Sequence, residues 1–156
     1  MSDNRSPTQP SGAGAFSAAD LKRRMAEREA AKAAEEARRM HEQEERQKEL
    51  LEEFHKPPDR TPDQVMQHVM TLVNRAAEAG QTEVQIYRFP SELCTDRGRA
   101  INNFEEGWEK TLTARPKLAY DFWHDRLRPL DFGLKAEVLE YPGGMPGDIG
   151  LSLTWK

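Results

Sequence analysis

The sequence predicts an α+β protein in which a long charged helix precedes a small domain with a three-stranded, mostly antiparallel sheet. Three observations predict this fold. They are two strand-like runs at the C-terminal end, a stretch of strong helix formers near the N-terminus, and apolar periodicities of helix and strand between them. The domain has the order helix, strand, helix, helix, strand, strand, and its helices are expected to cover one apolar face of the sheet.

The two C-terminal runs form a predicted β-hairpin. Apolar residues alternate with small or polar residues from Ile149 to Trp155, and a similar alternation runs from Leu134 to Val138. Because alternate side chains of a strand share one face, each run has one apolar face. The Gly- and Pro-rich segment 142–148 between them is a predicted hairpin loop.

Large apolar residues are unevenly distributed, and this divides the chain. The 156 residues are 37% hydrophobic and 32% charged, yet few large apolar side chains occur in the first sixty positions. We therefore predict a disordered tail at 1–16, a long charged helix at 17–56, a Pro-rich linker at 57–60 and a compact domain at 61–156.

Charge and cysteine content argue against several classes of protein. The net charge is −4, so the overall field does not draw the chain to phosphate backbones. Cys94 is the single cysteine, and no Cys/His spacing matches a zinc site. No apolar run reaches the roughly 18 residues that span a bilayer, and no secretory signal is evident. These features predict a cytoplasmic protein without a metal or other cofactor and without membrane contact.

The long charged helix has a clear start. Ser17 followed by Asp20 has the form of a capping box, and Phe16 with Leu21 has the spacing of a hydrophobic staple. From Ser17 to His55 the chain contains no Gly or Pro and is dominated by Ala, Glu, Arg, Lys, Gln and Met, which are strong helix formers.

One face of this helix has the spacing of a coiled-coil seam. The seam consists of Ala26, Ala30, Ala33, Ala37, Met40, Glu44, Gln47, Leu51 and Phe54. Alanine buries little surface, and two polar residues interrupt the seam, so a solvated helix held by its own ion pairs is the alternative. A basic first half and an acidic second half leave a third option, in which the helix pairs antiparallel with its own copy.

Helix and strand signals then alternate along the domain. Thr61 and Gln64 have the spacing of a capping box, and a proline stands at the first helical position, so a helix begins here and stops at Gly80. The segment 82–89 is rich in β-formers and predicts the first strand.

Two further helices are expected, at 95–112 and 116–130. The first has Thr95 as its N-cap, although Gly98 and Gly107 each weaken it by up to about 1 kcal/mol relative to alanine. The second opens on a proline, which suits the first helical position.

The predicted core takes apolar residues from every element of the domain. Its members are Val69, Ile86, Ile101, Phe104, Trp108, Phe122, Leu127, Val138, Leu151, Leu153 and Trp155.

The element order of the domain is that of a winged helix, in which the third helix reads DNA and the hairpin is the wing. On that helix Lys117, Arg126 and Arg128 favour DNA binding, but Asp121 and Asp125 would repel phosphates. The predicted wing tip, 142–148, also carries no Lys or Arg. A small α+β sandwich is the plain alternative. A KH-like order fits the middle of the chain, but the GxxG loop that this fold requires is missing.

No combination of residues indicates catalysis. His41 and His55 lie on or beside the charged helix, and His68 is expected at the edge of an apolar helix face. His124 and Asp125 are adjacent on a helix and are not expected to face each other. Cys94 precedes a predicted helix start, where the dipole can lower a thiol pKa, but an inert thiol is favoured because no resolving cysteine exists.

We therefore expect a non-enzymatic protein-interaction protein, with an adaptor or regulatory role and a protein partner. Weak self-association through the helix at 17–56 would fit the same reading. A winged-helix-like DNA-binding transcriptional regulator is the alternative. The candidate partner-binding residues are Tyr120, Trp123, Arg126, Arg128 and Met145.

Overall fold

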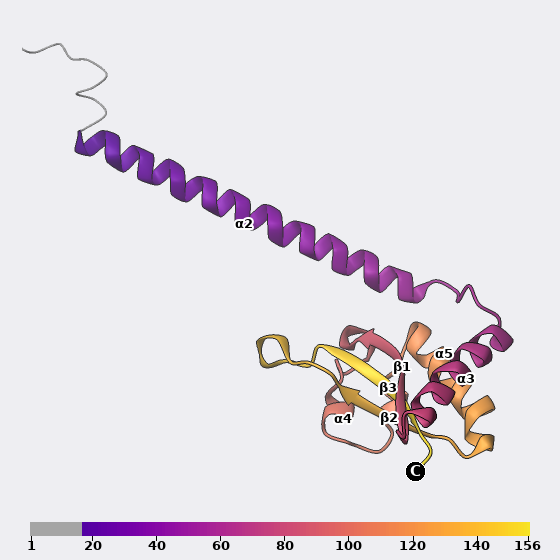
Figure 1. Cartoon of the computed structure of the whole chain (residues 1–156). Coiled ribbons are helices and arrows are strands. Elements are labelled where there is room, and N and C mark those ends of the chain that lie inside the picture. Colours follow the sequence, from indigo (N-terminus) through magenta and orange to yellow (C-terminus); the bar gives the residue numbers. More distant parts are fainter. Residues whose placement is uncertain (1–16) are drawn as a thin grey trace, which may run out of the picture. The chain divides into compact units, whose positions relative to one another are not determined.

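The computed structural model describes residues 17–156 and confirms the α+β fold (Figure 1). The elements are α2 (Ala18–His55), α3 (Pro62–Glu78), β1 (Glu83–Pro90), α4 (Arg99–Asn102), α5 (Ala114–Phe122), β2 (Gly133–Val138) and β3 (Asp148–Thr154). The three strands form one antiparallel sheet, as predicted. The predicted tail at 1–16, including Phe16 of the staple, lies outside the described residues.

Helix α2 is continuous over the predicted range, and no residue of it is fully buried. The Ser17 hydroxyl accepts a hydrogen bond from the Asp20 amide at 3.0 Å, which confirms the N-cap. Ion pairs along α2 stabilise the helix. For example, Arg38 pairs with both Glu35 and Glu42, each at 2.5 Å.

By its contacts the chain divides into two compact units between Lys48 and Glu49. Leu51 and Phe54, in the last turns of α2, pack against the hydrophobic core of the second unit. The end of α2 therefore belongs structurally to the domain.

Strand β3 lies in the centre of the sheet, in the order β1-β3-β2. Ile149, Leu151 and Leu153 of β3 share one face and are almost completely buried. The opposite face is polar, and on it Lys135 of β2 reaches Glu83 of β1 at 2.7 Å. This is the usual arrangement of an antiparallel sheet with one solvated face.

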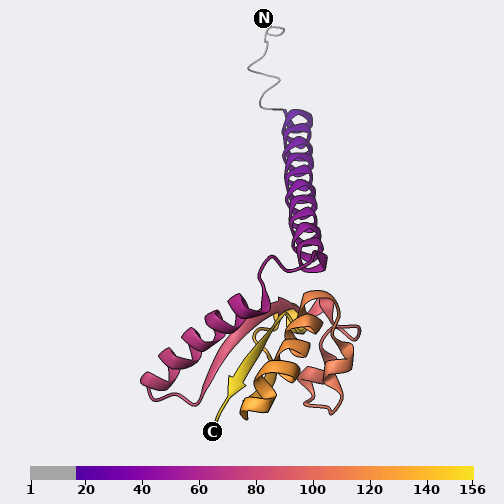
Figure 2. The ribbon, with the colours of Figure 1, turned by 90° about the vertical axis from the view of Figure 1, so that its right-hand side faces the viewer.

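Helix α3 lies alongside β1 (Figures 1 and 2). The Thr61 hydroxyl and the Gln64 side chain exchange hydrogen bonds with each other's backbone amides, so the predicted capping box is confirmed. Val69 and Val73 of α3 are buried against Leu153. The cap therefore fixes where this helix begins, and its apolar face attaches it to the sheet.

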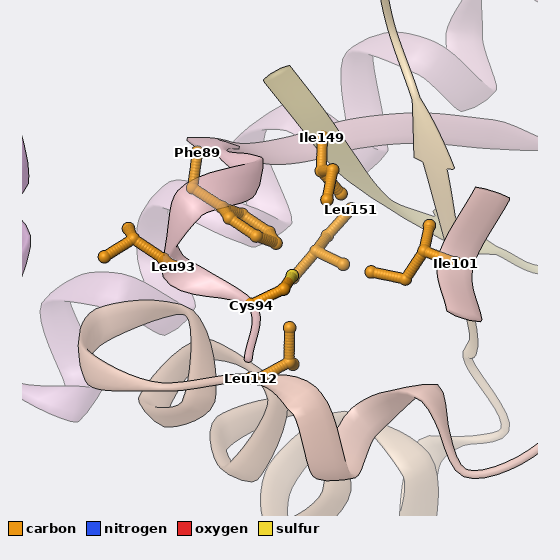
Figure 3. Close-up of a cluster of buried hydrophobic side chains, with 7 residues drawn as sticks. All are labelled: Phe89, Leu93, Cys94, Ile101, Leu112, Ile149 and Leu151. Carbon is orange, nitrogen blue, oxygen red and sulfur yellow. The ribbon is translucent and has the colours of Figure 1, made fainter. Parts of the chain in front are cut away.

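A second buried cluster lies between the strands and the segment that follows β1 (Figure 3). Phe89, Ile149 and Leu151 from the strands converge with Ile101 of α4 around Cys94 (Figure 3). This cluster holds the irregular segment after β1 on the sheet.

The prediction of one helix over 95–112 is wrong. Within this range the structure has only the single turn of α4 and a short 3₁₀ turn at Trp108–Thr111, and another 3₁₀ turn, Ser91–Leu93, precedes it. Gly98 and Gly107 adopt left-handed conformations, with φ of 87° and 81°, and these interrupt the helix. Thr95 is not an N-cap. The Asp96 carboxylate instead accepts hydrogen bonds from the amides of Gly98, just before α4, and of Ala100 in its first turn.

The helical segment 116–130 begins slightly earlier than predicted and is not uniform. Helix α5 ends at Phe122, a π-helical turn follows at Trp123–Leu127, and a 3₁₀ turn completes the segment at Arg128–Leu130.

Most predicted core positions are buried or packed against buried residues. Val69, Ile101, Leu127, Leu151 and Leu153 are buried, whereas Ile86, Trp108, Phe122, Val138 and Trp155 are partly buried and pack against the two clusters. Phe104, which the sequence predicts in the core, is instead 84% exposed. The helical stripe on which that prediction rested does not exist, because α4 ends at Asn102.

Candidate interaction surfaces

The segment from Thr95 to Thr111 is a compact loop whose two ends meet. The Thr95 amide donates to the Thr111 carbonyl at 2.8 Å, and Cys94 and Leu112 form a β-bridge just outside it. The buried side chain of Ile101 attaches the loop to the core. Loops closed in this manner and packed by their own side chains are frequently functional.

Phe104 follows α4 in a position that normally holds glycine. The Glu105 amide donates to the Ala100 carbonyl at 2.9 Å, and the Phe104 amide donates to the Ile101 carbonyl at 3.2 Å. These two bonds form a Schellman motif, in which the residue at the position of Phe104 is left-handed and usually glycine. Phe104 has φ of 54°, a conformation that costs an ordinary residue about 1 kcal/mol.

The hairpin loop lies beside this segment. The Tyr141 hydroxyl donates to the Asn102 side-chain oxygen at 2.5 Å, and the Ser91 hydroxyl donates to the Pro146 carbonyl at 2.9 Å. Tyr141 is 53% exposed and Met145 is 63% exposed. We name Phe104, Tyr141 and Met145 the loop surface. Of its members, the sequence singled out Met145 as a partner-binding candidate.

The two aromatic candidates from the sequence do not lie free on the surface. Tyr120 is half-buried and contacts Trp108 edge to face, with ring centroids 5.8 Å apart, and Trp123 at 5.5 Å. The Trp123 indole N–H donates to the Phe132 carbonyl at 2.9 Å. Both rings are therefore engaged within the domain, and Phe104 is the more exposed of the two exposed aromatic residues in the range 17–156, the other being Tyr141.

The basic candidates are exposed but have intramolecular neighbours. Arg126 lies 3.5 Å from the Asp63 carboxylate, and Arg128 lies 3.1 Å from the ring of His124. Lys117 lies 3.4 Å from Asp121. The structure also places His124 Nδ1 3.1 Å from the Asp125 carboxylate, so the expectation that these neighbours would point apart is wrong.

The end of α2 and the linker after it contact Tyr87 and Arg115 of the domain. Phe54 packs edge-on against Tyr87, and the Arg115 guanidinium donates to the carbonyls of Lys56 and Pro57 at 3.0 Å each. The Tyr87 hydroxyl oxygen is buried and has no hydrogen-bond partner. Burial raises the pKa of Tyr87 to about 12, although the positive charge of Arg115 opposes this.

The cysteine is in an inert environment. Burial raises the pKa of Cys94 to about 11, so the thiol is protonated at neutral pH and is a poor nucleophile. The dipole effect considered from the sequence does not apply, because no helix of sufficient length begins there.

Between residues 17 and 156, no three His, Cys, Asp or Glu residues come together in a way that could hold a metal ion. None of the helices in this range combines the length and apolar character needed to cross a membrane. A shallow, open and polar depression lies over the exposed side of α3, lined by Asp59, Arg60, Gln64, Gln67, His68 and Thr71.

No protein-family model, curated protein sequence or solved structure matches the chain.

Sequence reasoning missed the loop surface because it assigned Phe104 to a helical stripe. The signal that could have found it is the local composition. Asn102 and Asn103 precede the phenylalanine and Gly107 follows, and both residue types are typical of helix ends and turns. A segment of this composition is not expected to be a long helix, so a large apolar residue within it does not lie on a buried helix face.

Proposed function

We propose that this chain is a non-enzymatic protein-interaction protein with an adaptor or regulatory role, and that it docks a protein partner through the loop surface. The observation that carries the proposal is the combination found at Phe104. A large aromatic side chain is 84% exposed, and its backbone is held in a strained left-handed conformation. Strained backbone positions cluster at binding sites, where function offsets their cost.

Solubility and stability both disfavour this residue in the isolated chain. Glycine would relieve the strain in the Schellman motif, and a polar residue would avoid exposing an aromatic ring to water. A partner that encloses the ring recovers the burial energy of a large apolar side chain. Exposed aromatic anchors of this kind often dominate the binding energy of protein interfaces.

The exposed residues of the hairpin loop also suit a protein partner. Tyr141 presents a ring whose hydroxyl is fixed by Asn102 at the end of α4, and Met145 adds a flexible apolar side chain. Aromatic residues and methionine are enriched at the centres of protein interfaces. A charged pair, Arg99 with Glu105 at 3.0 Å, lies next to Phe104 in the chain and would suit the polar rim of an interface.

The site of action that we propose is the cytoplasm. The single thiol, Cys94, is free and buried, which fits a reducing compartment.

Affinity capture from the native host tests the docking proposal. The tagged full chain, its Phe104→Gly variant and its Leu118→Ala variant are compared, with retained proteins quantified by mass spectrometry. Leu118 is a matched control because it is an apolar residue of the same domain that is 49% exposed. The proposal expects a protein that the wild type and the control retain equally and that Phe104→Gly retains at least about tenfold less. Equal retention by all three chains contradicts it.

DNA binding is the second candidate, favoured by the order of elements from α3 to β3 and by the antiparallel sheet. The intramolecular neighbours of the basic side chains in the segment 114–130 argue against DNA binding. Lys117 and Arg126 lie beside carboxylates, and Arg128 lies beside His124. Low-salt binding to mixed duplex DNA, lost when all three become alanine, would favour this candidate. Absence of low-salt binding removes it.

A further inference from the structure

The large apolar side chains that α2 leaves exposed lie on one face of the helix. They are Leu21, Met25, Met40 and Leu50, each between 45% and 64% exposed. At 3.6 residues per turn, all four lie within a sector of about 100°. Leu21 and Met25 are near the start of the helix and Leu50 is near its end, whereas Met40 lies between them with charged residues of the same face. This is an exposed helix face on which three of the four large apolar residues lie towards the two ends.

Charge along α2 is also divided between the ends. The segment 22–32 has five basic and two acidic residues, whereas 42–53 has six acidic and two basic residues. A parallel pair of such helices would place like charges beside each other. An antiparallel pair places the basic segment of one copy along the acidic segment of the other.

We propose that the occupant of this face is a second copy of α2 in antiparallel orientation. One register of the two antiparallel helices brings together both the exposed apolar residues and the opposite charges. When Met25 of one copy lies level with Leu50 of the other, Leu21 lies level with the end of the partner helix. Glu36 of each copy then lies level with Arg39 of the other. Apolar residues meet near both ends, and opposite charges meet in the middle.

This interface extends the proposed function and is separate from the loop surface. Leu51 and Phe54, which continue the coiled-coil seam expected from the sequence, pack against the chain's own domain. The pairing therefore depends on few apolar contacts and on charge. It is expected to be weak and to weaken further as salt screens the charged segments.

Sedimentation equilibrium of the full chain measures the pairing. We expect a concentration-dependent dimer at about 0.05 M salt whose dissociation constant rises at least about tenfold at about 1 M salt. The Arg39→Glu variant should weaken the dimer by about tenfold, because it places like charges level at two symmetric positions. The double variant Glu36→Arg, Arg39→Glu should restore it. Circular dichroism of each variant shows whether the helix is intact.

Disulfide trapping tests the orientation. Two differently tagged chains carry Met25→Cys and Leu50→Cys, and Cys94 does not interfere because its thiol is buried. The proposal expects a mixed disulfide between the two chains. A matched pair, Ala34→Cys with His41→Cys, is level in the same register but on the outer face, and should remain reduced. A disulfide between two chains that both carry Met25→Cys would overturn the antiparallel register. A disulfide between Ala34→Cys and His41→Cys would overturn it as well.

A chain that remains monomeric at low salt and high concentration overturns the proposal altogether. The same measurement on Phe104→Gly separates this proposal from the docking proposal, because that variant should dimerise as the wild type does. Loss of dimerisation in Phe104→Gly would contradict the assignment of the interface to α2.

Discussion

Phe54, in the last turn of α2, meets Tyr87 of β1 edge to face, with ring centroids 6.3 Å apart and ring planes at 87°. This contact attaches the end of the long helix to the sheet domain. Aromatic pairs in this geometry contribute about 0.5–1.5 kcal/mol beyond the burial of their surface. The Tyr87 hydroxyl is itself buried and makes no hydrogen bond.

Replacing Phe54 with alanine should destabilise the domain by about 1–2 kcal/mol. This is less than the 3–5 kcal/mol typical of a fully buried phenylalanine, because Phe54 is only partly buried. Urea unfolding followed by tryptophan fluorescence measures the change. Glu52→Ala, on the exposed side of the same turn, is the control and should change stability by less than about 0.5 kcal/mol. Equal effects of the two substitutions would show that the contact does not hold the helix end.

Replacing Tyr87 with phenylalanine should stabilise the domain by about 1 kcal/mol at neutral pH. The substitution removes a buried hydroxyl that makes no hydrogen bond while keeping the ring contacts. Chemical unfolding measures the gain. A loss of stability would show that the hydroxyl has a partner in solution.

The same substitution should alter the response to alkaline pH. Burial raises the pKa of Tyr87 from 10 to about 12, so folding favours the protonated phenol. The contribution of this group is therefore fully present below about pH 10 and is lost as pH rises towards 12. Tyr87→Phe should show a smaller loss of stability over this window than the wild type does. Identical pH profiles would contradict the assignment.

Gly98→Ala should destabilise the domain by roughly 2 kcal/mol. Gly98 has φ of 87°, and an added Cβ would lie 3.1 Å from Ile149 Cδ1 and 3.3 Å from Ser91 Cβ. Gly80 is a matched control, since its φ is 80° and no atom lies within 4 Å of an added Cβ. Gly80→Ala should therefore show only the backbone strain, about 1 kcal/mol. Thermal or urea unfolding of both variants separates the contact from the strain, and equal losses would rule out the contact.

Cys94 should resist alkylation in the folded chain. Burial raises its pKa to about 11, so little thiolate exists at pH 8 and reagents have poor access to it. Mass spectrometry after iodoacetamide treatment should show slow labelling that accelerates only at urea concentrations that unfold the domain. Labelling of the native chain as fast as a free thiol would show that the cluster around Cys94 opens.

The elements with strong local signals could be predicted from the sequence. The capping box at Thr61 and Gln64 sets the start of α3, and the alternation around Leu151 and Leu153 sets β3. Helix α2 followed from the absence of Gly and Pro and from its helix-forming composition. In each case the local preference and the tertiary structure agree.

The segment after β1 could not be predicted, because tertiary contacts override its apparent helical stripe. Ile101 is buried as expected, but the left-handed residues on either side of α4 turn Phe104 away from the core. The contact of Phe54 with Tyr87 could not be predicted either, because the two residues are remote in sequence. The local sequence around each residue does not indicate which distant residue it contacts. The candidate site lies in these unpredicted parts.

Phe104→Gly, assayed for stability and for partner retention on the same preparation, tests the central claim most directly. The account predicts opposite outcomes in the two assays. The free energy of unfolding should rise by about 1 kcal/mol because glycine relieves the left-handed strain, while retention of the partner protein is lost. A stable variant that retains the same proteins as the wild type would contradict the claim that this residue is held strained and exposed for binding.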